Sequence, residues 1–270
     1  MFPTDTTSYA DIVLPGASFL EVTDMYRASG HNYIQIAQPV IPPVGQSRST
    51  LNIFQDLAAR LGFKDGVFAL DEMSFIKGFI LEDSPYMEGI DFETLMSGRA
   101  VRLNIPSNPY ADGFSTPSGK VEFYSQAMAD QGLDPLPDGQ PLRDPDGGDR
   151  YSLEFITPPH HFFLNSAFNE IDALRETAGK ARVMIHPETA QIRGIADGDP
   201  VRVFNDRGEC TFLAQVTNDT QAGLLVAEGL HWPRLSPGGG ANQLTSQRLT
   251  DMGDTCAFHC SLVEVQPCVT

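Results

Sequence analysis

The chain of 270 residues is long enough for one large domain or two ordinary ones, and its 41% hydrophobic content is sufficient for a packed core. Its 18 basic and 35 acidic residues give a formal charge of −17, and no run of Lys or Arg interrupts this excess, so nucleic acid is excluded as a main partner. No apolar stretch reaches the roughly 18–20 residues of a membrane span, and the first residues lack the basic region and apolar core of a signal sequence. We therefore expect a cytoplasmic protein with no membrane span.

The first 62 residues are predicted to belong to an α/β domain. Residues 10–15 form a short apolar segment typical of a strand, which ends at a proline that has no N–H to donate to a sheet. Residues 51–61 carry apolar side chains at helical spacing and stop at Gly62. One strand and one helix cannot cover both faces of a sheet, so residues 1–62 are interpreted as the C-terminal remnant of a larger α/β domain.

Residues 63–149 are predicted to be a mixed helical and hairpin connector. Helical patterns lie near 73–81 and 92–96, and the alternation in 120–124 is typical of an edge strand. Residues 134–150 are rich in Pro, Gly and Asp and have almost no large apolar side chains, which indicates an irregular linker and a domain boundary.

Residues 150–270 are predicted to form a small β domain. A single short helix is expected at 187–193. Six short strands, separated by turns rich in Gly and Asp, are expected at 151–156, 182–185, 200–204, 210–217, 223–227 and 257–265. Many short strands with such turns indicate a compact barrel or sandwich. Because an α/β remnant and a partly helical connector precede it, the predicted fold class of the chain is α+β.

The cysteines and histidines do not predict a metal site. Cys256 and Cys260 flank His259, but on a strand at 257–265 positions four apart are about 13 Å apart. That distance is too long for one zinc ion with bonds of about 2.3 Å. His160 and His161 are adjacent, so on a strand they face opposite sides and cannot bind one ion together. Motifs of phosphate loops, serine hydrolases and zinc proteases are absent, and we assign no catalytic residue and no metal ligand.

Two loops have the composition of ligand-binding segments. Residues 157–166 combine prolines, aromatic rings and hydrogen-bonding side chains, and residues 237–246 place three glycines before a cluster of amides and hydroxyls. Glycines let backbone N–H groups approach a ligand, and amide side chains both donate to and accept from a heterocycle edge. These loops suit a flat, polar cofactor that carries phosphate; the alternative is that they are ordinary surface loops.

Four segments, in this order along the chain, resemble the molybdopterin oxidoreductases of the dimethyl-sulfoxide-reductase type, a family that includes formate dehydrogenases and nitrate reductases. The segments are residues 4–15 together with Glu21 and Asp24, residues 116–125, residues 186–209, and residues 242–245. The first is similar to a stretch of the family's Rossmann-like third domain, and the third to the start of its C-terminal molybdopterin-dinucleotide-binding domain. The resemblance implies that residues 150–270 form a six-stranded double-psi β-barrel.

The resemblance also implies a cofactor and the residues that hold it. In this family two molybdopterin guanine dinucleotides bind molybdenum or tungsten through dithiolene sulfurs, and the protein orients them. Contacts along one dinucleotide would come from Thr157, Pro158, His160, His161, Leu164, Asn165 and Ser166. Asn242, Gln243 and Thr245 would bond its pterin or phosphates, with Phe258 and His259 as closing contacts. The aromatic and His content at 160–163 departs from the Arg-containing form that is common in this loop.

The chain therefore resembles the C-terminal third of a catalytic subunit, or a separately encoded piece of one. The cysteines of the family's iron–sulfur cluster have no counterpart before Cys210, and the metal-ligating side chain lies in an upstream part that this sequence does not contain. The expected partners are the rest of the catalytic subunit and an electron-transfer subunit, and the isolated chain is predicted to be inactive. Two alternatives are a stand-alone pterin-binding module or small subunit, and a barrel that binds no cofactor.

Overall fold

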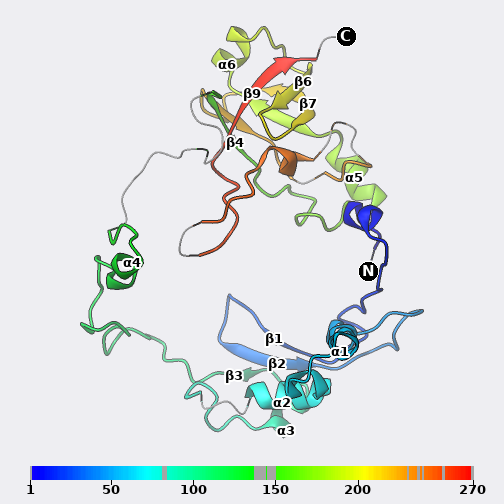
Figure 1. The fold of residues 1–270 in the computed structure, drawn as a ribbon, viewed down its shortest axis with the longest axis vertical. Coiled ribbons are helices and arrows are strands. Elements are labelled where there is room, and N and C mark those ends of the chain that lie inside the picture. The colour runs from blue at the N-terminus through cyan, green and yellow to red at the C-terminus, as the bar shows by residue number, and fades with distance from the viewer. Residues whose placement is uncertain are drawn as a thin grey trace. The chain divides into compact units, whose positions relative to one another are not determined.

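The computed structural model describes residues 2–80, 84–136, 144, 150–229, 231–235, 238, 240–250 and 253–268. They belong to two compact units, one of residues 10–121 and one of residues 2–9 and 122–270. Figure 1 labels the elements of both units. Among the described residues, none of the helices combines the length and apolarity needed to cross a membrane.

The first unit is built on a three-stranded antiparallel sheet in the order β1-β2-β3. The strands are β1 (Asp24–Arg27), β2 (Tyr33–Ala37) and β3 (Val101–Arg102). Alternate residues of β2, Ile34 and Ile36, are buried and pack with Ile76 and Leu95 from the helices. This sheet was not predicted, because its strands are short and β3 is far from β1 and β2 in sequence.

Helices α1 (Thr50–Leu61), α2 (Glu72–Ile80) and α3 (Phe92–Met96) lie where the sequence predicts them, and the 3₁₀ turn η2 (Gly66–Ala69) follows α1. The hydroxyl of Ser49 caps α1 by accepting the N–H of Asn52 at 3.2 Å. Gly62 ends the helix in the left-handed region, at φ 82°.

Two predicted strands of this region are wrong. Residues 10–15 form no strand, and their neighbour Gly16 makes only an isolated bridge with Arg48. Ile12 is 78% exposed, so these apolar side chains are not inside a sheet of this unit. Residues 120–124 also form no strand, because the Lys120 carbonyl accepts the hydroxyl of Thr116 at 2.6 Å in a turn.

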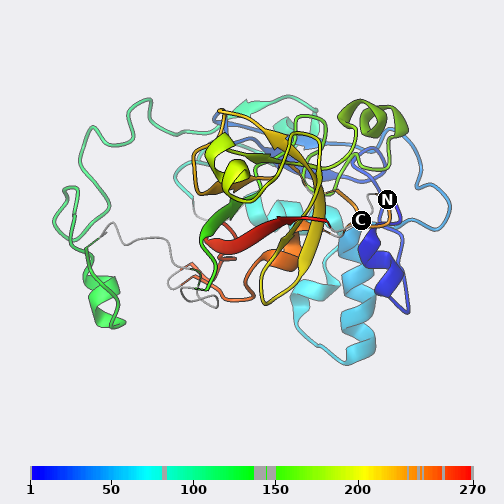
Figure 2. The ribbon, with the colours of Figure 1, turned by 90° about the horizontal axis from the view of Figure 1, so that it is seen from above.

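The second unit is dominated by a closed barrel of six strands in the order β4-β8-β5-β7-β6-β9. Figures 1 and 2 show this unit in two views, with its last strand, β9, in red. The strands are β4 (Leu153–Ile156), β5 (Arg182–Ile185), β6 (Pro200–Phe204), β7 (Glu209–Val216), β8 (Leu224–Val226) and β9 (Ser261–Pro267). The pairs β4–β8 and β5–β7 are parallel, and the other four are antiparallel. The unit also contains η1 (Asp5–Tyr9), α4 (Gln126–Asp130), α5 (Asp172–Ala178), α6 (Pro187–Ile192) and η3 (Ala241–Leu244).

The barrel encloses one core, because alternate residues of its strands point inward. Val201 and Val203 of β6, Phe155 of β4 and Val263 of β9 are each at most 1% exposed. The last strand begins at Ser261 rather than at residue 257. Cys256 and Cys260 therefore precede the strand, and the strand spacing used to exclude a zinc site does not apply to them.

Glu21 joins two loops of the first unit. Its carboxylate accepts the N–H groups of Ser18 and Val44, both at 2.6 Å, and the hydroxyl of Ser47 at 3.0 Å. These hydrogen bonds, those from Ser18 first, lower the pKa of Glu21 from 4.5 to about 2. Ionised Glu21 thus stabilises the fold above pH 4.5, and this contribution is lost as the pH falls toward 2.

We predict that Glu21→Gln removes this acid-dependent contribution. The wild type should lose more stability than the variant between pH 4.5 and 2, and the two should differ by a constant amount above that range. Urea unfolding midpoints at a series of pH values measure the difference, with Glu93→Gln in the same unit as the control. Parallel pH curves for wild type and Glu21→Gln would contradict the prediction.

Candidate functional site

A cavity of about 200 Å³ lies at one end of the barrel and joins four separate segments of the chain. It is lined by Thr157, Pro158, Pro159, Asn165, Gly229, Asn242 and Phe258. We call it the Asn242 cavity. Both loops singled out in the sequence contribute to it, so they lie at the same end of the barrel. Of the predicted cofactor residues it brings together Thr157, Pro158, Asn165, Asn242 and Phe258.

The position of the 157–166 loop is fixed by backbone pairing beyond the end of β4. The N–H of Ala227 donates to the Ile156 carbonyl at 3.0 Å, and the N–H of Gly229 donates to the Pro158 carbonyl at 2.9 Å. Gly229 has φ 81°, and a Cβ atom there would lie 2.7 Å from the Cβ of His160. Only glycine allows this approach, so Gly229 shapes the loop as well as lining the cavity. Sequence reasoning missed Gly229, since nothing around it marks a contact with a loop some seventy residues earlier.

Two residues at and just after the end of this loop are in the left-handed region. Asn165 has φ 52° and Phe168 has φ 74°. Asn tolerates this conformation, whereas an aromatic residue adopts it at a cost of about 1–3 kcal/mol. The indole N–H of Trp232 fixes the turn by donating to the Ser166 carbonyl at 2.9 Å. Asn165 lines the Asn242 cavity, and the strained residue, Phe168, follows it three positions later.

The other predicted cofactor residues do not line this cavity. His160 stacks on Phe163 with ring centroids 5.0 Å apart, and His161 contacts Phe162 edge-on. Leu164 is 64% exposed. Their roles, and those of Ser166, Gln243, Thr245 and His259, stay predictions.

Three of these residues lie next to the lining. Thr245 donates its hydroxyl to the Asn242 carbonyl at 2.9 Å. Gln243 lies against Gly208, since a Cβ atom added at Gly208 would be 3.1 Å from the Cβ of Gln243. His259 lies against Phe258 with ring centroids 4.0 Å apart. Thr245 and His259 therefore each contact a residue that lines the Asn242 cavity, and Gln243 follows one in sequence.

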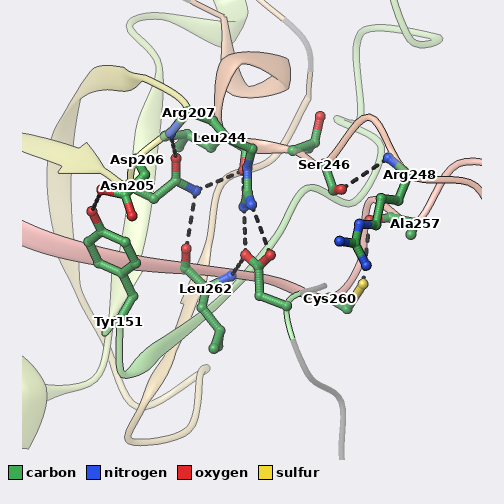
Figure 3. A network of polar contacts seen from close by, with 12 residues as sticks. Tyr151, Asn205, Asp206, Arg207, Leu244, Ser246, Arg248, Ala257, Cys260 and Leu262 are labelled. Carbon is green, nitrogen blue, oxygen red and sulfur yellow. Dashed lines mark hydrogen bonds and ion pairs between the residues drawn. The ribbon is translucent and has the colours of Figure 1, made fainter. Parts of the chain in front are cut away.

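The carbonyl of Leu244 anchors the second loop. It accepts the side-chain amide of Asn205 at 2.9 Å and the guanidinium of Arg207 at 2.8 and 3.0 Å (Figure 3). Asn205 also donates to the Leu262 carbonyl at 3.1 Å, and its own side-chain oxygen accepts the N–H of Arg207 at 2.9 Å. Leu244 is fully buried, so the loop that carries Asn242 is fastened at a point two residues away.

Arg207 is held in turn by a buried carboxylate from the linker. The Asp144 carboxylate accepts hydrogen bonds from Nη1 and Nη2 of Arg207, at 2.8 and 2.6 Å, and from the N–H of Leu262 at 2.8 Å. The Asp144 side chain has no exposed surface. We call Asp144, Asn205, Arg207, Leu244 and Leu262 the Arg207 network. Asp144 could not be found from sequence, because the composition of residues 134–150 predicts a solvated linker.

The chemistry of the Asn242 cavity is that of a binding site. Its described lining contains one hydroxyl, two side-chain amides, two proline rings and one aromatic ring, and no ionisable side chain. Such a set fits a flat, polar heterocycle, whose edge the amides bond and whose faces the rings cover. In the described part of the chain no three His, Cys, Asp or Glu side chains gather as metal ligands would.

Comparisons with known proteins match both units. Residues 153–262 match the family model described as Molydopterin dinucleotide binding domain, and residues 1–60 match the model described as Molybdopterin oxidoreductase. The chain is 34% identical to the probable oxidoreductase YoaE of Bacillus subtilis over 98% of its own length and 39% of that protein. It is 30% identical to the dimethyl sulfoxide reductase DmsA of Escherichia coli over 97% of its length and 36% of that protein.

The fold is shared with a solved structure. Acetylene hydratase from Pelobacter acetylenicus superimposes with a TM-score of 0.72 at 23% identity, covering 98% of this chain and 39% of that chain. The chain thus spans less than two fifths of the length of each of these three proteins.

We predict that Arg207→Met destabilises the barrel by about 3–5 kcal/mol, because it leaves the Asp144 carboxylate buried and unpaired. The control is Arg202→Met, which breaks an ion pair with Glu209. The side chains of Arg202 and Glu209 are 38% and 63% exposed, so this variant should lower the free energy of unfolding by no more than about 1 kcal/mol. Urea unfolding followed through the fluorescence of Trp232 measures both.

Hydrogen exchange gives a second measure of the Arg207 network. Residues 241–248 should exchange faster in Arg207→Met than in Arg202→Met under conditions where both variants are folded. Equal stability losses, or unchanged exchange in residues 241–248, would show that the network does not hold the loop.

Proposed function

Because the chain belongs to the molybdopterin oxidoreductase family, we propose that it forms the cofactor-binding C-terminal part of such an enzyme's catalytic subunit. The cofactor is molybdopterin guanine dinucleotide with molybdenum or tungsten, and when bound it supplies two-electron transfer, as oxygen-atom transfer or substrate oxidation. The observation that carries this proposal is the Asn242 cavity, in which both predicted ligand loops and Phe258 meet at one end of the barrel.

The residues of the cavity bind and orient the cofactor. The amides of Asn165 and Asn242 and the hydroxyl of Thr157 would hydrogen-bond the polar edge of one pterin. Pro158 and Phe258 would provide apolar contacts and exclude water. None of these groups takes up or releases a proton near neutral pH, so we assign them no part in the proton or electron transfer itself.

The cavity takes only one portion of a dinucleotide. Its volume of about 200 Å³ is below the range of about 300–1,000 Å³ that is typical of complete ligand sites. The rest of the cofactor is enclosed by further polypeptide, which we propose is the remainder of the catalytic subunit, and electrons pass to a separate subunit in the cytoplasm. The isolated chain then has no turnover.

We also propose the finer domain organisation. The barrel of residues 150–270 has double-psi topology, and the two parallel pairs, β4–β8 and β5–β7, within an otherwise antiparallel closed sheet support it. Residues 1–62 are the end of a Rossmann-like α/β domain, supported by the match of residues 1–60 to the oxidoreductase model. Residues 63–149 are the connector, of which 63–121 pack in the same compact unit as residues 10–62.

We predict that Asn242→Ala and Asn165→Gly each weaken binding of molybdopterin guanine dinucleotide about three- to tenfold, because each removes one amide that bonds the ligand. Glycine is chosen at position 165 because it keeps the φ of 52° without strain. Anaerobic titration of the chain, followed by pterin fluorescence, measures the affinity, and Asn218→Ala at an exposed turn is the control.

Two results would contradict the proposed function. One is the absence of saturable binding to the wild-type chain, which would favour a barrel without a cofactor. The other is turnover with stoichiometric molybdenum in the purified chain, which would show that it is not part of a larger catalytic unit. Equal losses in Asn218→Ala and Asn242→Ala would move the site away from the Asn242 cavity.

A further inference from the structure

A larger cavity, of about 340 Å³, lies beside α5 and β7 and shares no lining residue with the Asn242 cavity. We call it the Trp232 cavity. Its described lining consists of Asn169, Arg175, Gly179, Lys180, Ala181, Thr211, Phe212, Leu213, His231, Trp232 and Leu235. None of these residues belongs to the predicted cofactor site, and neither the sequence analysis nor the proposed function uses this space.

A buried amide in this lining has an unused hydrogen-bond donor. Asn169 is 1% exposed, and its side-chain oxygen accepts the N–H of Trp232 at 3.3 Å. Its backbone carbonyl accepts the guanidinium of Arg175 at 2.8 Å. The side-chain nitrogen of Asn169 is buried and has no partner among the residues that the structure describes. Buried donors of this kind are rare because they lose their hydration without compensation, so the position calls for an acceptor beyond those residues.

The charge of the lining is opposite to that of the chain. The formal charge of the whole protein is −17, yet the described residues around this cavity include Arg175 and Lys180 and no carboxylate. Lys180 makes no ion pair with any residue that the structure describes, whereas Arg175 is already bonded to Asp172 and to the Asn169 carbonyl. A smaller cavity of about 160 Å³ shares Lys180 and His231 and adds Arg182 and one carboxylate, Glu228. The cavity is therefore suited to an anion, with Lys180 as the available cation.

The remaining walls are apolar and aromatic. Trp232 and Phe212 are 4% and 6% exposed, and Leu213 and Leu235 complete this side. His231 is also part of the lining, and burial, with a smaller effect from His160, lowers its pKa, so its imidazole is neutral near pH 7. Aromatic walls beside a neutral imidazole favour a flat ring over an extended chain or a bare inorganic ion.

We propose that the Trp232 cavity binds a small planar aromatic anion, a heteroaromatic carboxylate or a nucleoside monophosphate. The ring lies among Trp232, Phe212 and Leu235, a ring or carboxylate oxygen accepts the side-chain N–H of Asn169, and the anionic group pairs with Lys180. This site is separate from the Asn242 cavity and does not rest on the proposed cofactor.

Trp232 is the only tryptophan of the chain, so its fluorescence reports on this cavity directly. We expect nicotinate or 5′-AMP to change that fluorescence saturably, and nicotinamide and adenosine, which are matched in shape but neutral, to bind at least about tenfold more weakly. Inorganic phosphate alone should compete only weakly, since it lacks the ring. If neutral and anionic probes bind equally, or none changes the fluorescence, the proposal is wrong.

Two variants test the assigned contacts. Asn169→Asp keeps the oxygen that accepts the Trp232 N–H but replaces the unused donor with a carboxylate, and should abolish binding of the anionic probe. Lys180→Gln should weaken binding about tenfold, while Lys64→Gln makes the same charge change outside the barrel unit and should leave it unchanged. Equal effects of Lys180→Gln and Lys64→Gln would overturn the assignment of Lys180.

A competition experiment separates this site from the cofactor site. Molybdopterin guanine dinucleotide should not displace the anionic probe from the wild-type chain, and Asn242→Ala should bind the probe as the wild type does. Displacement would show that the Trp232 cavity belongs to the cofactor site and would overturn the proposal. Loss of dinucleotide binding with retained probe binding would instead contradict the proposed function alone.

Discussion

The arrangement of the barrel end that carries the Asn242 cavity depends on one buried ion pair. Asp144 has no exposed side-chain surface. Its charge is compensated by hydrogen bonds from Nη1 and Nη2 of Arg207 and from the backbone N–H of Leu262. A buried carboxylate is tolerated only with such compensation, so Arg207 is confined to one position. From there its guanidinium reaches the Leu244 carbonyl, and the loop that carries Asn242 has a fixed path. The Arg207 network therefore defines the geometry of this loop, although burying the Asp144 carboxylate costs desolvation free energy.

Strand packing and the Arg207 network have different tasks. The core of the barrel fixes where the strands end, since its inward-facing valines and Phe155 exclude water completely. The core also holds the 241–245 segment, because Ala241 and Leu244 are part of it. Hydrogen bonds from Asn205 and Arg207 to the Leu244 carbonyl then fix the backbone of that segment. The 157–166 loop contributes no residue to this core cluster, and it is held by backbone hydrogen bonds that Ala227 and Gly229 donate.

Local patterns allowed much of the fold to be predicted. The alternation around Val201 and Val203 and the turns rich in Gly and Asp indicated the barrel strands, because period-two burial is a local property. The sheet of β1, β2 and β3 was missed, since β3 has only two residues and pairs with a strand more than sixty positions earlier. Residues 10–15 were wrongly predicted as a strand because apolar composition does not show whether a partner is present.

Prediction of the site had the same limit. Asn165 and Asn242 stood out because amides next to prolines or glycines are typical of ligand loops. Gly229 and Asp144 did not, because their importance arises from contacts across the fold. Glycine is needed at position 229 only because His160 lies against it. The Asp144 carboxylate can be buried only because the guanidinium of Arg207 pairs with it. A linker composition of Pro, Gly and Asp gives no sign that one of its carboxylates is enclosed.

The 157–166 loop separates two cavities. Thr157, Pro158 and Asn165 line the Asn242 cavity, whereas His160, from the same loop, stacks on Phe163 and lines the small cavity that shares Lys180 and His231 with the Trp232 cavity. Gly229 packs against the Cβ of His160 while its N–H donates to the Pro158 carbonyl. The His160–Gly229 contact therefore lies between the Asn242 cavity, which Gly229 lines, and the small cavity, which His160 lines. One glycine position thus shapes the loop on both of these sides, because a side chain there would displace His160.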